Sequence, residues 1–205
     1  HGVRGSELAW FESYLRGRTQ SVMIDCVKSS RLSIEYGVPQ GAILSPLLFI
    51  IYTADMHMAT AHSTVAAYAD DTNARISVPR EKIQEGVKKL EEDYDKLWQW
   101  CAANSLKLNA TKTEFFIAHS PYMRQVPEIT LNLRSIPFKA RPFIKILGVT
   151  FDKHMKFVEH VRIKSAKITA FLRTLSSRRA VFTRSAMTTL VHSYVSSSIL
   201  YCLPS

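Results

Sequence analysis

Residues 65–78 read Val-Ala-Ala-Tyr-Ala-Asp-Asp-Thr-Asn-Ala-Arg-Ile-Ser-Val and place two adjacent carboxylates, Asp70 and Asp71, between two stretches typical of β-strands. Successive side chains of a strand point to opposite faces, so neighbouring Asp residues can face one ion only where the strand bends into a turn. The pattern therefore predicts a β-hairpin with the Asp pair at its tip. An isolated Asp-Asp more often just begins a β-turn, and the surrounding sequence decides between the two interpretations.

The chemistry of this pair is that of a divalent cation site. Carboxylates this close repel each other, so one of them would tend to take up a proton unless a cation shared the site. Magnesium prefers oxygen ligands and usually keeps waters or substrate phosphates beside one or two carboxylates. Asp70 and Asp71 are therefore candidate metal ligands for chemistry on phosphates.

Residues 36–52 supply the context, because they pack two Gly and a Pro into five positions and then begin an apolar run. Ser45 is a favourable N-cap and Pro46 suits the first position of a helix, so we expect the helix to begin there. Gly37 and Gly41 allow the backbone to come close to a nucleotide or a template base. An ordinary loop is the alternative for this segment taken alone.

Taken together and in order, these segments resemble the palm of reverse transcriptases from non-LTR (LINE-type) retrotransposons. The resemblance rests on Gly-Val-Pro-Gln-Gly at 37–41, Ser-Pro-Leu-Leu-Phe at 45–49 and Tyr-Ala-Asp-Asp at 68–71. Further blocks continue it at residues 10–20, 98–112 and 146–149. Ordered blocks are far more specific than any one block alone.

The resemblance implies an α+β fold. Residues 1–152 would form part of a right-hand polymerase-like palm, an antiparallel sheet with helices, and residues 153–205 a small helical thumb that holds the template and primer duplex. It also implies an RNA-directed DNA polymerase that copies an RNA template from a DNA primer with deoxynucleoside triphosphates. In such two-metal chemistry, one Mg²⁺ or Mn²⁺ ion lowers the pKa of the primer 3′-hydroxyl and the other steadies the departing pyrophosphate.

The same resemblance implies roles for particular residues. Asp70 would ligate both ions and Asp71 would support the site, while Lys112 sits where a general acid could protonate pyrophosphate. For Lys112, a strand-edge lysine in contact with solvent is an equally good interpretation. Leu147 and Gly148 would form the primer-grip turn. The nucleotide and template pocket and the primer end would be lined by Gly37, Pro39, Gln40, Gly41, Tyr68 and Ala69.

One part of the resemblance is unmatched. Enzymes of this kind bridge their ions with a further Asp on an earlier palm strand, and no residue of this sequence stands at that position. We therefore expect the fingers and the first palm strand to be missing here, and the chain alone to be inactive. Asp25, Asp55 and Asp152 are candidate substitutes, although each is more typical of a turn or a surface. The alternatives are a truncated or domesticated nucleic-acid-binding remnant without catalysis, and a structural remnant without a specific partner.

Charge is distributed unevenly along the chain. The 205 residues carry a net charge of +10 with a pI near 9.7. Residues 1–100 hold slightly more acidic than basic groups, so the whole positive excess lies in residues 101–205. Lys and Arg displace condensed counterions from nucleic acid, which favours a phosphate-binding track, although a solvated basic face is the alternative. The residues expected to contact the backbone are Arg162, Lys164, Lys167, Arg173, Arg178 and Arg179.

Periodicity predicts the remaining elements. A hairpin is expected over 20–36 with its turn at 28–30, followed by an amphipathic helix after Pro79 whose Glu, Lys and Asp residues form the outer face. Strands are expected over 113–118, 128–134 and 143–151, with Pro121, Pro127, Pro137 and Pro142 in the segments between them. From Phe157 onward two helices should pack together. The inner stripe of the first would be Val158, Val161, Ile168, Phe171 or Leu172, and Leu175.

Cysteine and histidine indicate no further site. Cys26, Cys101 and Cys202 are widely spaced, so neither a disulfide framework nor a zinc site is indicated, and a reduced, intracellular setting with the nucleus as the expected compartment fits best. The histidines His57, His62, His154 and His160 lack the spacing of metal ligands. The apolar run over 42–52 is too short to span a bilayer, so no membrane partner is expected. The oligomeric state is left open.

Overall fold

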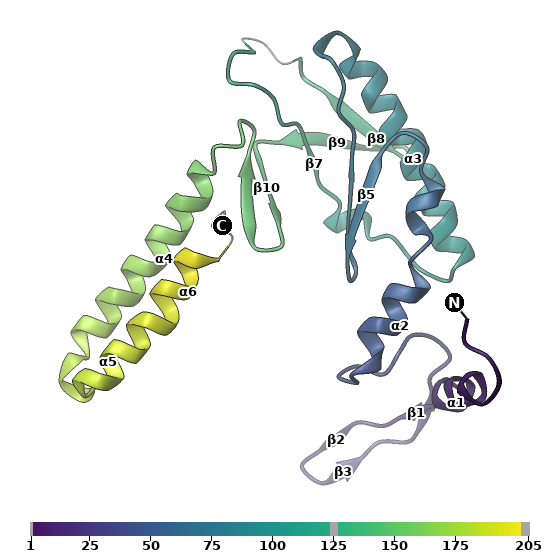
Figure 1. Ribbon diagram of the computed structural model, residues 1–205, viewed down its shortest axis with the longest axis horizontal. Helices are drawn as coiled ribbons and strands as arrows, with labels where there is room; N and C mark the ends of the chain where they lie inside the picture. Colours follow the sequence, from purple (N-terminus) through teal and green to yellow (C-terminus); the bar gives the residue numbers. More distant parts are fainter. Residues whose placement is uncertain (1, 124–126, 202–205) are drawn as a thin grey trace. The chain divides into compact units, whose positions relative to one another are not determined.

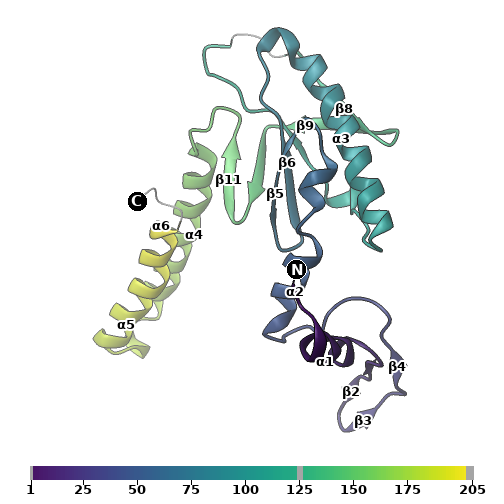
Figure 2. The same ribbon diagram turned by 45° about the vertical axis from the view of Figure 1, so that its right-hand side comes forward.

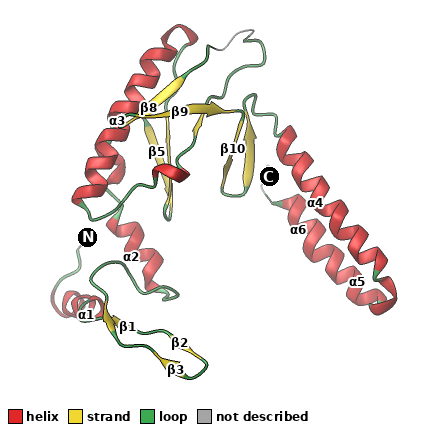
Figure 3. Cartoon of the chain, turned by 180° about the vertical axis from the view of Figure 1, so that it is seen from behind, coloured by secondary structure: helices red, strands yellow, loops and turns green. Residues whose placement is uncertain are grey.

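The computed structural model describes residues 2–123 and 127–201, and the chain divides into two compact units, residues 1–76 and 77–205. Helices and small, mostly antiparallel sheets occur in both units (Figure 3), which confirms the α+β class. The predicted boundary between palm and thumb at residue 152 falls inside the second unit and stays a prediction. No helix of the described residues combines the length and apolar character that a membrane crossing requires.

The N-terminal unit begins with one helix and two short strand ladders. The helix is α1 (Gly5–Leu15), and the ladders pair β1 (Thr19–Gln20) with β4 (Leu32–Ser33) and β2 (Met23–Ile24) with β3 (Val27–Lys28). The predicted turn at 28–30 is wrong, because the chain reverses at Asp25 and Cys26, whose φ angles are 46° and 66°. Ser29 pairs across the ladder instead: its N–H donates to the Val22 carbonyl at 2.9 Å and its Oγ accepts from the Val22 N–H at 2.9 Å.

The rest of this unit carries residues 37–41, called the glycine segment below, and the Asp pair. Its elements are α2 (Leu44–Tyr52), the 3₁₀ helix η1 (Met56–Ala59), β5 (Thr64–Tyr68) and β6 (Asp71–Arg75). The predicted N-cap is wrong, since α2 begins at Leu44 and Ser45 lies within its first turn. Pro46 is tolerated there because the N–H groups of a first helical turn have no partner within the helix.

The core of the C-terminal unit lies between one long helix and a three-stranded sheet (Figure 1). The helix α3 (Ile83–Ala103) follows the short helix η2 (Arg80–Lys82), and η3 (Ala110–Lys112) leads into a sheet of order β7-β9-β8. The strands are β7 (Phe115–Phe116), β8 (Thr130–Leu133) and β9 (Ile136–Arg141). The predicted amphipathic helix is confirmed. The buried cluster comprises Val87, Phe115, Ile129, Leu131 and Leu133, with Ile83, Leu90 and Tyr94 packed against it.

Two features of this core contradict the predictions. Strand β9 contains Pro137, which was expected to separate strands. Pro137 lies opposite Asn132, in the second residue pair from the two-residue turn. In an antiparallel hairpin the two residues of that pair do not hydrogen-bond each other. The missing N–H of Pro137 therefore removes no hydrogen bond between the strands. Asp93 was expected on the outer face of α3, yet it is fully buried, with Lys96 Nζ 3.8 Å from its Oδ1.

The C-terminal unit ends in a β-hairpin and a pair of helical segments that lie side by side (Figure 1). The hairpin pairs β10 (Phe143–Ile146) with β11 (Val149–Asp152). The helical segments are α4 (Val158–Ser177), η4 (Arg179–Val181), α5 (Arg184–Val191), a π turn (His192–Ser196) and α6 (Ser197–Leu200). The predicted packing of two helices is confirmed, because the rings of Phe171 and Tyr194 stack with centroids 4.2 Å apart.

The inner stripe of α4 differs from the predicted one at its N-terminal end. Val158 and Val161 are 65% and 59% exposed, whereas Ile163, Ile168, Phe171 and Leu175 are half-buried or buried. The start of α4 contacts β11 instead, where Asp152 accepts the Val158 N–H at 3.0 Å and the Thr150 N–H donates to His160 Nδ1 at 3.1 Å. The helical period places apolar residues on one face but does not fix how far along the helix its partner reaches. Cys202 lies outside the described residues.

Candidate functional site

The Asp pair lies at the tip of the β5–β6 hairpin, which confirms the predicted local structure (Figure 2). Tyr68 pairs with Asp71 across the hairpin, so Ala69 and Asp70 form a two-residue turn. Ala69 has a φ of 51°, a left-handed conformation that an L residue with a Cβ rarely adopts. This tight reversal keeps the two consecutive carboxylates at one end of the hairpin.

The register of the hairpin assigns the side chains to two faces. Residues directly opposite each other in an antiparallel pair share a face, so Tyr68 and Asp71 lie on the same side. The other side carries Val65 and Ala67, which face α2 and η1. Asp70 and Asp71 are both exposed. A cation in solvent can therefore reach both carboxylates without any rearrangement of the hairpin.

The donor set fits a hard divalent cation that completes its shell from elsewhere. Two carboxylates with open positions for waters or phosphates match what Mg²⁺ takes in substrate-linked sites. Within residues 2–123 and 127–201, no group of three or more His, Cys, Asp or Glu side chains could hold a metal ion. The proposed substitutes Asp25 and Asp55 lie in the turn between β2 and β3 and just before η1.

The third proposed substitute, Asp152, has a local structural role. Its carboxylate accepts hydrogen bonds from the backbone N–H groups of Lys156, His154 and Val158 at 3.0, 3.1 and 3.0 Å. These hydrogen bonds, that from Lys156 first, lower the pKa of Asp152 below its ordinary value. Asp152 therefore organises the loop between β11 and α4.

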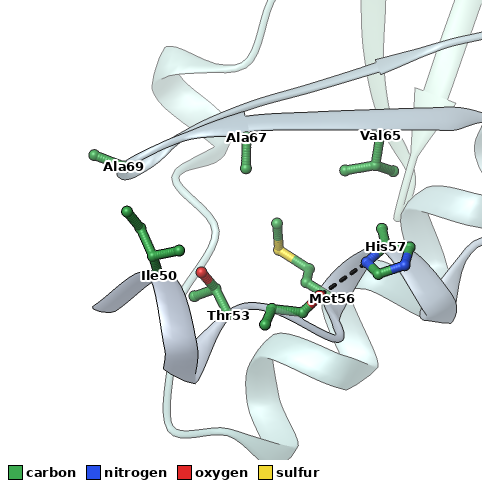
Figure 4. A pocket seen from close by; sticks show the side chains of 8 residues that line it. Ile50, Thr53, Met56, His57, Val65, Ala67 and Ala69 are labelled. Carbon is green, nitrogen blue, oxygen red and sulfur yellow. Dashed lines mark hydrogen bonds between the residues drawn. The ribbon is translucent and has the colours of Figure 1, made fainter. Parts of the chain in front are cut away.

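A pocket of about 220 Å³ lies beneath the hairpin, on the face away from Tyr68 and Asp71 (Figure 4). Val65, Ala67 and Ala69 of the hairpin line one wall. The opposite wall comes from the end of α2 and from η1, where His57 Nδ1 lies 2.8 Å from the Ala54 carbonyl. Its residues are Ile50, Thr53, Ala54, Met56 and His57. Apart from Thr53 and His57, the lining is apolar.

The glycine segment forms an exposed loop held at two carbonyls. Gly37 and Gly41 have φ angles of 81° and 82°, and nothing lies within 4 Å of a Cβ built at either, so backbone conformation rather than crowding requires glycine. The Arg18 guanidinium donates to the Gly37 carbonyl, and the buried Ser45 hydroxyl donates to the Pro39 carbonyl.

These two tethers leave the Gln40 side chain exposed at the top of the loop. Sequence reasoning missed Arg18 and Ser45 as positioning residues. Their partners are backbone carbonyls, which leave no signature in the residue pattern.

Lys112, Leu147 and Gly148 belong to the C-terminal unit. Lys112 is the exposed last residue of η3, a turn that Asn109 caps by accepting the Thr111 N–H at 3.0 Å. Leu147 and Gly148 connect β10 and β11 with φ angles of 47° and 85°. Positive φ at both central residues defines a type I′ hairpin turn. The turn expected at this position is therefore present, while its contact with a primer stays a prediction.

The six basic residues expected on the nucleic-acid backbone fall into two groups. Arg162 makes two hydrogen bonds to the Glu159 carboxylate, at 2.8 and 2.6 Å, which raise the pKa of Arg162 and lower that of Glu159. Lys164 is half-buried, with its Nζ 5.3 Å from the centre of the Tyr201 ring. The remaining four are exposed and form no ion pair with any described residue: Lys167, Arg173, Arg178 and Arg179.

An α+β chain with an exposed pair of Asp carboxylates on a tight hairpin has the features of a phosphoryl-transfer site. The family described as reverse transcriptase (RNA-dependent DNA polymerase) matches residues 2–151. The chain therefore belongs to the reverse transcriptase family, as its ordered sequence blocks predicted.

Individual relatives agree with this assignment. The "RNA-directed DNA polymerase from mobile element jockey" of Drosophila melanogaster is 31% identical over 157 residues, which cover 73% of this chain and 17% of the relative. Its counterpart of the same name in Drosophila funebris is 32% identical over 157 residues with the same coverage. The "Probable RNA-directed DNA polymerase from transposon BS" of Drosophila melanogaster is 31% identical over 160 residues, 74% of this chain and 17% of the relative.

The chain thus spans about a sixth of the length of these curated relatives. No solved structure matches it.

Proposed function

We propose that this chain supplies the catalytic hairpin of an RNA-directed DNA polymerase of a non-LTR retrotransposon. The observation that carries the proposal is the exposed Asp70–Asp71 pair at the tip of the β5–β6 hairpin, in a chain of the reverse transcriptase family. In this proposal residues 1–152 are part of the palm and residues 153–205 form the thumb. The template is RNA, the primer is DNA and the substrates are deoxynucleoside triphosphates. A nuclear location for the polymerase stays a prediction.

The metal ligands are the first residues assigned. Asp70 and Asp71 would hold Mg²⁺ or Mn²⁺, and bound ions of this kind lower the pKa of a primer 3′-hydroxyl and balance the charge of the leaving pyrophosphate. Tyr68 lies on the same face of the hairpin as Asp71, so it borders the place of the primer end. The backbone of Ala69 closes this edge of the site with its left-handed turn.

Further residues are assigned to the substrates. The loop of Gly37, Pro39, Gln40 and Gly41 presents exposed backbone and the Gln40 side chain to the template base and the incoming nucleotide. Lys112 donates a proton to pyrophosphate as it leaves, and Leu147 and Gly148 contact the primer. We call the helical segments α4 to α6, residues 158–200, the helical hairpin. Its exposed cations bind phosphates without reading sequence.

A nucleic-acid-binding form without catalysis is the second candidate. The observation that favours it is that no third acidic or metal-ligating side chain joins Asp70 and Asp71 among the described residues. Both candidates share the basic helical hairpin, so nucleic-acid binding alone does not distinguish them. Primer extension does.

The test is a hybrid polymerase in which this chain replaces the matching segment of the jockey polymerase of Drosophila melanogaster. We expect the hybrid to extend a DNA primer on an RNA template in Mg²⁺. Asp70→Asn should lower the rate by orders of magnitude while leaving binding of primer and template nearly intact. Glu7→Gln is the matched control, because it likewise replaces an exposed carboxylate of the same unit with its amide.

Two results would contradict the proposal. The first is a hybrid that binds primer and template but does not extend the primer, under conditions where the unmodified jockey polymerase does. The second is an Asp70→Asn hybrid that extends at the rate of its parent. The first result would support the second candidate.

A further inference from the structure

The β10–β11 hairpin depends on its neighbours for its orientation. It is a separate two-stranded sheet, and an isolated two-stranded hairpin is marginally stable at best. Near its middle, the Thr150 N–H donates to His160 Nδ1 of α4 at 3.1 Å. At its base, the rings of Phe151 and Phe157 lie 5.4 Å apart. These contacts hold strand β11 but do not involve the turn at Leu147 and Gly148.

A third contact fixes the turn itself. The Tyr201 hydroxyl, just after α6, donates to the Leu147 carbonyl. The Tyr201 ring also lies against Gly148, because a Cβ built there would be 3.4 Å from Cε1 and 3.5 Å from the hydroxyl oxygen. A methyl group at position 148 would therefore touch the ring at ordinary van der Waals distance.

The ring is in turn contacted from α4. Lys164 Nζ lies 5.3 Å from the ring centroid, within the range of a cation–π interaction. At about 100° per residue, Lys164 falls between Phe171 and Leu175 on the face of α4 that packs against the second helical segment. This position explains why Lys164 is half-buried while Lys167 and Arg173 are exposed.

We propose that Tyr201 is a positioning residue that locks the Leu147–Gly148 turn onto the helical pair α4 and α6, with Lys164 supporting its ring. The inference rests on the proposed function, in which this turn contacts the primer. A primer end must be held close to its reactive geometry, and displacement by about 1 Å can cost about a hundredfold in rate. A single hydroxyl–carbonyl bond at the tip of a two-stranded hairpin is suited to prevent such displacement.

The first test asks, without nucleic acid, whether the Tyr201 hydroxyl restrains the Leu147–Gly148 turn. We call this restraint the lock. Tyr201→Phe removes only the hydroxyl and keeps the ring against Gly148 and Lys164. In the 205-residue chain, amide hydrogen exchange of the segment 144–151 should become about fivefold faster, as expected for the loss of one hydrogen bond. Exchange in α4 should stay unchanged, and the melting temperature should fall by at most about 2–4 °C, as expected for the loss of one hydrogen bond in a chain of this size. Tyr194→Phe is the matched control, since it removes a hydroxyl that donates to no described residue from the same helical segment, and it should leave exchange over 144–151 unchanged.

The second test measures the consequence for a primer. An RNA template annealed to a DNA primer with 2-aminopurine at its 3′ end should show different end fluorescence when bound to Tyr201→Phe than to the wild-type chain. Total affinity for the duplex should be the same, because the exposed cations are unchanged. Tyr194→Phe should give the wild-type fluorescence.

The outcomes separate the lock from the proposed function. Unchanged exchange over 144–151 in Tyr201→Phe would overturn the lock, whatever the chain binds. Equally accelerated exchange throughout the C-terminal unit would also overturn it, because Tyr201 would then only stabilise the fold. If Tyr201→Phe speeds up exchange only over 144–151 and leaves the 2-aminopurine fluorescence at the primer end unchanged, Tyr201 has no role in positioning the primer. A wild-type chain that fails to bind the duplex would count against the proposed function, while the exchange result would still decide the lock.

Discussion

The helical hairpin allows a quantitative prediction about nucleic-acid binding, because its basic residues are not equivalent. Lys167, Arg173, Arg178 and Arg179 are exposed and form no ion pair with described residues. Arg162 is already paired with Glu159 through two hydrogen bonds. Replacing the four unpaired residues with Gln should therefore weaken duplex binding strongly. Replacing Arg162 alone should change it little, because its guanidinium already donates to Glu159 and is not free to contact a phosphate.

The expected size follows from counterion release. Each phosphate contact adds about 0.7 to 0.9 to the magnitude of the slope of log affinity against log salt concentration. Four contacts therefore account for about three units of slope, or about a thousandfold in affinity at 0.1 M salt when the non-electrostatic contribution is unchanged. For Arg162→Gln we expect a change in slope well below one unit.

The assay is fluorescence anisotropy of an RNA/DNA hybrid titrated at several salt concentrations between about 50 and 200 mM. A control variant neutralises four exposed lysines outside the helical hairpin: Lys82, Lys88, Lys107 and Lys153. This control has the same net charge and should lose less than about one unit of slope. The reasoning is refuted if the slope is unchanged when Lys167, Arg173, Arg178 and Arg179 are replaced. It is also refuted if the control variant loses as much slope as this variant. Either result would identify the hairpin charges as an ordinary solvated face.

Three further predictions concern the elements that position the site. Ser45→Ala removes a buried hydroxyl from the Pro39 carbonyl, so we expect a loss of about 1–2 kcal/mol in denaturant unfolding and faster amide exchange over 37–41. Gly148→Ala introduces a Cβ at a φ of 85° and beside the Tyr201 ring, and it should cost about 1–2 kcal/mol in the same measurement. Asp152 has a lowered pKa in the folded state, so its stabilising effect is present above its ordinary value of 3.8 and is lost as pH falls through the folded-state value. The destabilisation by Asp152→Asn, measured by urea unfolding, should therefore be larger at pH 7 than at pH 3, and equal values at the two pH conditions would contradict this role.

Local patterns predicted the parts of the fold that depend on local physics. The apolar run 65–67 and the β-leaning stretch 72–78 on either side of Asp70 and Asp71 are sufficient for a hairpin, because a two-residue turn is the shortest way to reverse the chain between them. The amphipathic helix α3 was predictable from its 3.6-residue period. Even so, the same period placed Asp93 on the outer face, because a single charged residue within a polar sequence gives no sign that it is buried.

The failures share a physical origin in conformations that the residue type does not favour. The turns at Asp25–Cys26 and Arg134–Ser135 put non-glycine residues at positive φ, so the usual glycine signal for a two-residue hairpin is absent. Strand β9 was missed for the same reason and because Pro137 suggested an interruption. The tethers from Arg18 and Tyr201 join residues 19 and 54 positions apart, and only the folded chain brings them together.

The central claim is that Asp70 and Asp71 hold a divalent ion, and paramagnetic Mn²⁺ tests it most directly. Titration of Mn²⁺ into the ¹⁵N-labelled chain should broaden amide signals selectively at residues 68–72, and excess Mg²⁺ should reverse the effect. In the Asp70→Asn, Asp71→Asn double variant this broadening should be lost, while Glu7→Gln should retain it. Broadening at residues 68–72 that persists in the double variant, or its absence from the wild-type chain at millimolar Mn²⁺, would contradict the account.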